Sequence, residues 1–280
     1  MRTPAVLPPV TTRSTVPVLR RRDTVLDFDL RGDAGPAVVQ LHGLTSSRAR
    51  EDLIAVDLVG ELDGCRVLRY DARGHGRSTG PRDATAYGWP TLADDLLALV
   101  AHVFPGEQVH GVGSSMGSAT LLHAAPASPS SFAGLTLCIP PTVWETRVAQ
   151  GAAYEDCAVV VETQGVDALV EAGRAAPHPP AENPDKPVTW PDVAIDLLPT
   201  VFRGAALTDL PDRSVLAGLD VPALILAWIE DPAHPVSTSE QLHDLLPHSE
   251  LVVARTHPDV RLWPAMVAEH VHRDAPVTPG

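Results

Sequence analysis

The sequence has little positive charge. Its 280 residues include 21 lysines and arginines, of which Lys186 is the one lysine, against 35 aspartates and glutamates. Nucleic acids and anionic membrane surfaces are bound through clustered basic side chains. The net charge of −14 therefore argues against nucleic acid and membrane as partners, and it favours neutral or cationic partners. The partner that we expect is a small-molecule substrate.

Cysteines and long apolar runs are also scarce. The three cysteines, Cys65, Cys138 and Cys157, form no C-x-x-C pair, and this spacing favours buried, reduced thiols. No stretch is long and apolar enough to span a membrane, and the first residues, MRTPAVLPPVTTRS, lack the apolar run of a signal peptide. We expect a cytoplasmic protein.

Continuous apolar runs alternate with helical patterns along most of the chain. Residues 16–32 resemble a hairpin, and the runs that follow predict strands over 36–43, 65–70, 108–115, 134–141, 221–228 and 249–254. Helical spacing lies between them at 50–64, 91–103, 115–125, 237–247 and 263–273, with Thr91 as the expected cap of the second helix. Strands that are apolar throughout are buried on both faces. The predicted fold is therefore α/β, a mostly parallel central sheet with helices on both faces.

The alternation stops for about seventy residues in the second half of the chain. Residues 141–211 contain helical stretches and the Pro-rich segment PHPPAENPDKP, but no strand pattern of the same quality. We interpret this block as a helical lid, inserted after the sixth strand. The predicted organisation is a first part of the core at 1–140, a lid at 141–211 and a second part of the core at 212–280.

One short segment carries the chemistry. Gly113-Ser114-Ser115-Met116-Gly117 fits the pattern G-x-S-x-G, directly after a predicted strand and directly before a predicted helix. A serine on so tight a turn is held in a strained conformation, and glycine is favoured two residues before and after it because the backbone passes close by. Only Ser115 has glycine at both positions. We predict Ser115 as the nucleophile.

Three segments in this order resemble the α/β-hydrolase family. QLHGLTSS is similar to the His-Gly loop after the third strand of that family, YDARGHGRS to the loop after the fourth, and GVGSSMGS to its nucleophile elbow. The resemblance covers most of the chain outside the lid. It implies a serine esterase or lactonase with a helical lid, and no metal or organic cofactor.

The family order of catalytic residues is serine, then an acid, then histidine. LILAWIEDPAHP resembles the end of the strand where the acid lies, which assigns Asp231 with Glu230 as the fallback. For the base the resemblance favours His257, which follows the last strand, although the usual Gly-rich loop is absent there. His234 is the alternative base, and it lies in the loop of the acid itself.

The remaining assignments follow from position. The backbone N–H groups of Leu44 and Met116 are the expected oxyanion hole, and His42 is expected to brace its loop. The residues of the next loop, Asp71, Arg73 and Gly76, are interpreted as loop architecture. His110, in the strand before the elbow, and His123, in the helix after it, are interpreted as structural.

Only 12 of the 280 residues are aromatic, and several fall in or near the lid. Trp144, Tyr154 and Trp228 are therefore candidates for substrate binding, with packing of the lid as the alternative interpretation. Arg147 lies on the same helical face as Trp144. We expect it to face solvent, with contact to a substrate carboxylate as the alternative.

These residues predict cleavage of a carboxylic ester or lactone with an apolar acyl group, through an acyl-enzyme on Ser115. The same triad serves C–C bond hydrolysis, thioester cleavage and acyl transfer in the family, so these remain alternatives. A further alternative is a member that binds a ligand or processes a natural product without hydrolysis. Dehalogenases and epoxide hydrolases of this fold carry aspartate where this chain has Ser115, and these two activities are disfavoured.

Overall fold

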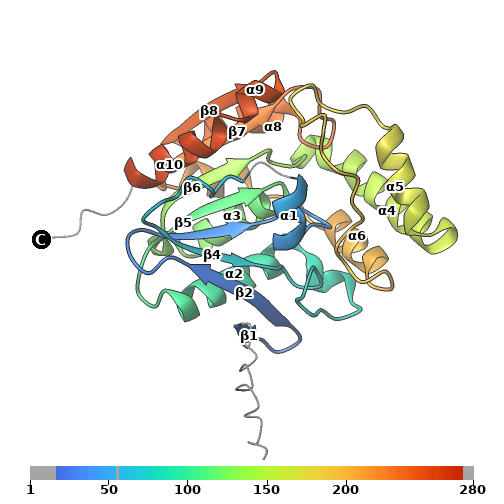
Figure 1. Ribbon diagram of the computed structural model, residues 1–280, viewed down its shortest axis with the longest axis horizontal. Helices are drawn as coiled ribbons and strands as arrows, with labels where there is room; N and C mark the ends of the chain where they lie inside the picture. The colour runs from blue at the N-terminus through green and yellow to red at the C-terminus, as the bar shows by residue number, and fades with distance from the viewer. Residues whose placement is uncertain (1–16, 55–56, 274–280) are drawn as a thin grey trace, which may run out of the picture.

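An eight-stranded sheet forms the centre of the molecule (Figure 1). The structure, a computed structural model, describes residues 17–54 and 57–273. The strands follow the order β1-β2-β4-β3-β5-β6-β7-β8 across the sheet. They are β1 (Val18–Arg20), β2 (Val25–Arg31), β3 (Ala37–Leu41), β4 (Arg66–Tyr70), β5 (Val109–Ser114), β6 (Phe132–Cys138), β7 (Ala223–Trp228) and β8 (Ser249–Ala254).

The sheet is parallel from β4 to β8, and only β1 and β2 run against their neighbours. The two antiparallel strands are the predicted hairpin. In the parallel part, the carboxyl ends of all strands lie at the same edge of the sheet. In open α/β sheets, ligands bind at this edge. This arrangement confirms the predicted fold class.

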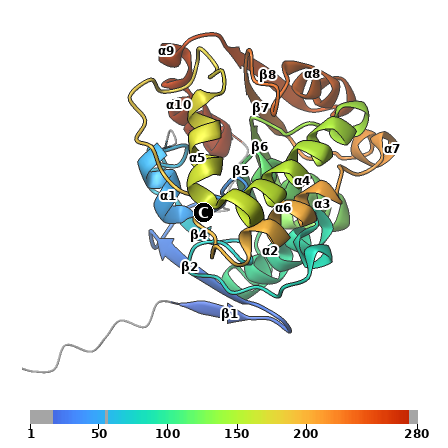
Figure 2. The same cartoon turned by 90° about the vertical axis from the view of Figure 1, so that its right-hand side faces the viewer.

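Each central strand is buried on both faces, which explains its continuous apolar sequence. In β7, Ile225 belongs to one core cluster, whereas Leu224 and Leu226 belong to another. Side chains of neighbouring strand residues point to opposite faces, so the two clusters lie on the two sides of the sheet. Figure 2 shows α1 and α10 on one side and α2, α3 and α8 on the other.

The core helices take the positions that the sequence indicates, with local differences. They are α1 (Arg48–Ile54), α2 (Trp89–Val103), α3 (Met116–Ala127), α7 (Arg213–Ala217), α8 (Val236–Leu245), α9 (His257–Val260) and α10 (Trp263–Arg273). The predicted helix over 50–64 is too long, because residues 58–61 form a turn. Thr91, the predicted cap, lies inside α2. The helix begins at Trp89, with Gly88 as its N-cap residue and Pro90 in its first turn.

Besides the short helix α7, three α-helices lie in the segment between β6 and β7. They are α4 (Arg147–Gln164), α5 (Val166–Ala175) and α6 (Leu198–Ala206), and they lie together beyond the carboxyl edge of the sheet (Figures 1 and 2). Among these three helices, α4 and α6 pack against each other most extensively. A third apolar cluster, which includes Tyr87, Val161 and Leu198, fixes these helices on the core. The division of the chain into core and lid remains a prediction.

Arg147 is buried, not exposed as its sequence pattern suggests. Its side chain lies over the ring of Trp89, with the guanidinium carbon 4.3 Å from the ring centre. Its Nε donates to the carbonyl of Thr208 at 2.7 Å, and Nη2 donates to the carbonyl of Ala205. The expectation was wrong because the end of α6 presents free carbonyls that satisfy a guanidinium without a carboxylate. Arg147 therefore joins α4, α6 and the core.

No helix in the described part of the chain is long and apolar enough to cross a membrane.

Candidate active site

A single residue separates β5 from α3, and that residue is Ser115. Its φ of 52° lies in the left-handed region, which costs energy for any residue with a side chain. Because α3 starts at Met116, Ser115 directly precedes the first backbone N–H groups of the helix, which have no acceptor within it. The turn therefore has the strained strand-to-helix geometry that the sequence motif predicts.

The two flanking glycines are required because the backbone passes too close for a side chain. A Cβ on Gly117 would lie 2.6 Å from the carbonyl oxygen of Leu41. A Cβ on Gly113 would lie 2.5 Å from the carbonyl carbon of Gly117. Both contacts are with backbone, which cannot move aside without disturbing β3 or α3. The G-x-S-x-G spacing thus follows from steric exclusion.

Gly117→Ala should therefore destabilise the protein, by about 1–3 kcal/mol, the usual cost of forcing an extra methyl group into a packed site. Gly173→Ala is the matched control. Gly173 lies in α5, where a Cβ would meet no atom within 4 Å, so alanine should be neutral there or stabilise by about 0.5–1 kcal/mol. Urea unfolding of both variants measures the difference. Equal stability of the two would contradict this account of the elbow.

Ser115 belongs to a chain of two hydrogen bonds. Its Oγ lies 2.8 Å from Nε2 of His234, and Nδ1 of His234 lies 2.7 Å from Oδ2 of Asp231. The aspartate comes from the loop after β7, which also carries the histidine three residues later. The side chains of Asp231 and His234 are 12% and 18% exposed, so the pair is shielded from water while Ser115 stays half-buried. The geometry is that of a serine, its base and an orienting carboxylate.

The structure places His234, and not His257, beside Ser115. The expectation that His257 would contact the nucleophile is therefore wrong, and the alternative histidine takes its place. The loop after β7 turns back on itself, with the backbone N–H of His234 donating to the carbonyl of Asp231 at 3.2 Å and Glu230 at a φ of 63°. This turn directs both side chains towards the elbow. His257 instead begins α9, on the wall of a cavity described below.

Asp231 is held as an anion by several donors. Burial alone raises the pKa of this carboxyl, but the hydrogen bond and charge of His234, with hydrogen bonds from the Trp228 indole and the Ala233 backbone, lower it to about 2. The indole Nε1 donates at 2.8 Å and the Ala233 N–H at 2.9 Å. Asp231 consequently stays ionised at any pH where the protein would work. Trp228, expected to bind substrate, orients the carboxylate in this structure.

Leu44, the expected partner of Met116 in the oxyanion hole, lies in the loop after β3. The preceding residue, Gly43, faces Ser115, because a Cβ there would lie 3.6 Å from Cβ of that serine. The next residue, Thr45, has a φ of 61°, so the loop turns sharply at this point. The assignment of the Leu44 and Met116 N–H groups to an oxyanion remains a prediction, which the closeness of Gly43 to Ser115 supports.

Two buried histidines fix the loop that contains Leu44. His42 Nδ1 donates to the carbonyl of Gly43 at 2.8 Å, and its Nε2 accepts the N–H of Ala72 at 2.9 Å. His75 Nε2 accepts the N–H of Thr45 at 3.1 Å. Since both Nε2 atoms act as acceptors, both rings are neutral. Burial lowers the pKa of each, that of His75 to about 3, so this bracing does not depend on pH in the ordinary range.

The loop after β4 is held by ion pairs inside the protein. Asp71 accepts hydrogen bonds from the Arg48 side chain and from the backbone of Arg77, and Arg73 binds Asp95 through two nitrogens, at 2.7 and 3.0 Å. Gly76 lies so close to the Asp71 carboxylate that a Cβ would approach its Cγ to 2.5 Å. These contacts are architectural, as the sequence predicts for this loop.

The other two histidines near the elbow also contact protein groups. Nε2 of His110 lies 3.1 Å from Oγ1 of Thr136, and Nε2 of His123 lies 2.9 Å from the carbonyl of Asp209. Trp144 donates its Nε1 to the carbonyl of Pro211 at 3.2 Å. These contacts hold the elbow strand and helix and the segment after β6 in place.

Tyr154 stacks on Phe202 with 6.2 Å between the ring centres. Neither Trp144 nor Tyr154 belongs to the wall of the large cavity in the described residues, whereas Phe202 does. Their role in substrate binding remains a prediction.

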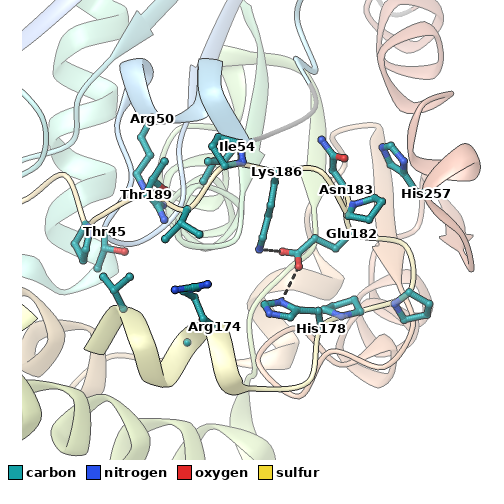
Figure 3. Close-up of a pocket in the computed structure, with 18 of the residues that line it drawn as sticks. Thr45, Arg50, Ile54, Arg174, His178, Glu182, Asn183, Lys186, Thr189 and His257 are labelled. Carbon is teal, nitrogen blue, oxygen red and sulfur yellow. Dashed lines mark hydrogen bonds and ion pairs between the residues drawn. The ribbon is translucent and has the colours of Figure 1, made fainter. Parts of the chain in front are cut away.

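A cavity of about 930 Å³ lies over the carboxyl edge of the sheet, enclosed by α1, α5, α9 and residues 178–191 (Figure 3). Its apolar wall includes Ile54, Leu169 and Val170. Its polar wall includes Arg50, Arg174, His178, Glu182, Lys186 and His257, so that cations outnumber anions. Within the described residues, no group of three or more histidines, cysteines or carboxylates is placed to hold a metal ion.

Comparison with known proteins identifies the fold. Residues 36–157 match the family model described as alpha/beta hydrolase fold. The crystal structure of an enol-lactonase from Burkholderia xenovorans superposes with a TM-score of 0.72, over 92% of this chain and 99% of that one, at 21% identity. The chain therefore has the α/β-hydrolase fold, as the three sequence motifs and the strand order indicate.

Curated relatives share only parts of the sequence. The 3-oxoadipate enol-lactonase 2 of Acinetobacter baylyi is 26% identical over 193 residues, covering 67% of this chain and 69% of the relative. A protein of Mycobacterium tuberculosis named "Probable oxidoreductase EphD" is 40% identical over 84 residues, which cover 30% of this chain. That match spans 14% of the length of the mycobacterial protein.

Proposed function

We propose that this protein is a serine hydrolase that cleaves a carboxylic ester or lactone, with Ser115 as nucleophile, His234 as general base and Asp231 as the orienting carboxylate. The observation that carries the proposal is the pair of hydrogen bonds from Ser115 through His234 to Asp231. The enol-lactonases among the similar proteins support the same class of reaction, since an enol-lactone is a cyclic ester.

The hydrogen bonds fix which nitrogen of His234 carries the proton. An ionised carboxylate only accepts hydrogen bonds, so Nδ1 of His234 must be the protonated nitrogen that donates to Asp231. Nε2 is then unprotonated and accepts the Ser115 hydroxyl proton. Transfer of that proton to Nε2 makes the serine oxygen nucleophilic as it attacks the substrate carbonyl carbon, and Asp231 stabilises the imidazolium that results.

The remaining steps return the site to its starting state. The negative charge on the carbonyl oxygen is stabilised by the N–H groups of Met116 and Leu44, each worth about 3–4 kcal/mol in comparable sites. His234 then gives its proton to the leaving alkoxide as the tetrahedral intermediate collapses to the acyl-enzyme. A water molecule, deprotonated by His234, attacks the acyl carbon, and Ser115 leaves as its hydroxyl is reprotonated.

A fluorophosphonate probe tests the proposal because it reacts with activated serines. We expect one adduct, on Ser115, together with turnover of short 4-nitrophenyl esters. Ser114→Ala is the matched control, since Ser114 lies at the end of β5 and should leave labelling intact, while Ser115→Ala abolishes it. Mass spectrometry of the labelled peptide locates the adduct. An unlabelled Ser115 with no ester turnover would refute the hydrolase assignment.

A further inference from the structure

Arg50 differs from the other cations of the large cavity because no carboxylate neutralises it directly. Arg174 is paired with Glu171 at 3.0 Å, and Lys186 and His178 both contact Glu182. Arg50, which is half-buried, makes one side-chain hydrogen bond within the described residues, from Nε to Oγ1 of Thr189 at 3.0 Å. Both terminal amino groups of its guanidinium thus have no partner in the described protein.

The carboxylates nearest to Arg50 are engaged elsewhere. Glu51 accepts the hydroxyl of Ser46 at 2.7 Å, and Asp192 accepts the hydroxyl of Ser47 at 2.5 Å. Burial lowers the pKa of the Arg50 guanidinium, and the charges of Glu51 and Asp192 oppose this only in part. Arg50 lines the cavity, so its two unpaired terminal amino groups are available to donate hydrogen bonds to an anionic ligand there.

The loop that faces Ser115 also reaches the wall of the cavity. Gly43 faces Ser115, and Thr45, two residues later, lines the cavity (Figure 3). Two steps between consecutive Cα atoms span at most about 7.6 Å. Ser115 is not itself part of the cavity wall in the described residues, so a substrate whose ester is at Ser115 would reach the cavity by passing Thr45 with an aliphatic chain, which Leu169 and Val170 of α5 would cover.

We propose that the cavity binds a carboxylate at the far end of the substrate, with Arg50 as the residue that determines this specificity. The natural substrate class is then an ester or lactone derived from a dicarboxylic acid. This inference rests on the proposed function, and it replaces the wholly apolar acyl group that the sequence predicts with an apolar chain that ends in a charge. A planar guanidinium with two free amino groups matches a carboxylate in two parallel hydrogen bonds.

Matched pairs of esters test the proposal. The 4-nitrophenyl monoesters of adipic and suberic acid differ from 4-nitrophenyl hexanoate and octanoate only by a carboxylate in place of the terminal methyl group. We expect the wild-type protein to prefer the anionic member by on the order of 10- to 100-fold in kcat/KM, as suits a hydrogen bond between charged groups. The preference should weaken as salt is raised.

Arg50→Gln should lower kcat/KM for the anionic esters far more than for the neutral esters and so remove the preference, and Arg50→Lys should keep part of it because it keeps the charge. Arg20→Gln, on the exposed surface of β1, is the matched control and should change neither. A wild-type protein that treats both members of each pair alike, or an Arg50→Gln variant that keeps the preference, would overturn the inference.

Failure of the proposed function is distinguished by a binding measurement. In the Ser115→Ala variant, isothermal titration compares the adipate monoester with the hexanoate ester without turnover. Tighter binding of the anionic ester, lost in the Ser115→Ala, Arg50→Gln double variant, supports the carboxylate site even if no ester is hydrolysed. Equal binding of the two esters contradicts it whatever the activity.

Discussion

His234→Ala is expected to lower kcat by at least about 10⁴-fold, whereas His257→Ala should retain nearly full activity, measured on the same 4-nitrophenyl ester. Without the His234 imidazole no base accepts the Ser115 proton, and no acid protonates the leaving group. His257 lies on the cavity wall, at the start of α9, and touches neither Ser115 nor Asp231 in the described structure. Its removal changes only the surroundings of the substrate.

Both histidine variants must be folded for this comparison to be valid. Circular dichroism and thermal unfolding establish that, and the fluorophosphonate probe gives a second readout, because His234→Ala should also slow labelling of Ser115. The opposite pattern, with activity lost in His257→Ala and kept in His234→Ala, would make His257 the base. Loss in both variants would mean that the two histidines act together in the reaction.

The contrast between these histidines shows what the sequence can predict. The elbow is local: Gly113, Ser115 and Gly117 lie on one tight turn, and the requirement for glycine arises from atoms that are fixed by the adjoining strand and helix. Such features can be recognised from the spacing of residues in the sequence. The alternation of apolar runs likewise predicts the parallel sheet, because burial on both faces leaves its mark on every strand.

The base could not be assigned in this way, because the direction of its side chain depends on how one loop turns. The left-handed conformation of Glu230 and the turn between Asp231 and His234 bring the carboxylate and the imidazole together, and no residue in DPAHP predicts that geometry. The proline and histidine that follow Asp231 are the sequence signal from which the alternative base could have been predicted. Their closeness to the acid argued against His234 in the sequence, although it is what lets one loop supply both groups.

Arg147 and Arg50 illustrate the same limit for charged side chains. Their neighbours in space come from segments far along the chain, Trp89 and Thr208 for Arg147 and Thr189 for Arg50. Helical periodicity says which face of a helix a residue occupies, but not which carbonyls or rings approach that face. The cavity is likewise formed by α1 and a loop about 130 residues later, so its charge could not be predicted from either segment alone.

Asp231→Asn should lower kcat on the order of 10⁴-fold without changing the fold of the loop. A neutral amide does not stabilise the imidazolium of His234, and its amino group, if turned towards Nδ1, favours the wrong tautomer. Glu230→Gln is the matched control: Glu230 is the adjacent, exposed carboxylate, and activity should persist without its charge. Activity lost in Glu230→Gln but kept in Asp231→Asn would transfer the role of the acid to Glu230.

The same variant also tests the pKa of Asp231 through stability. The pKa is about 2 in the folded protein and about 3.9 in an unfolded chain, so the unfolded state binds the proton more readily. The ionised carboxylate therefore stabilises the fold by on the order of 2 kcal/mol above about pH 4, and this contribution is lost as the pH falls towards 2. Urea unfolding should show that the wild-type protein has a larger unfolding free energy than Asp231→Asn at pH 5. This difference should narrow as the pH falls from about 4 towards 2. A difference that is constant with pH would mean that Asp231 is not held as an anion by His234, Trp228 and the Ala233 backbone.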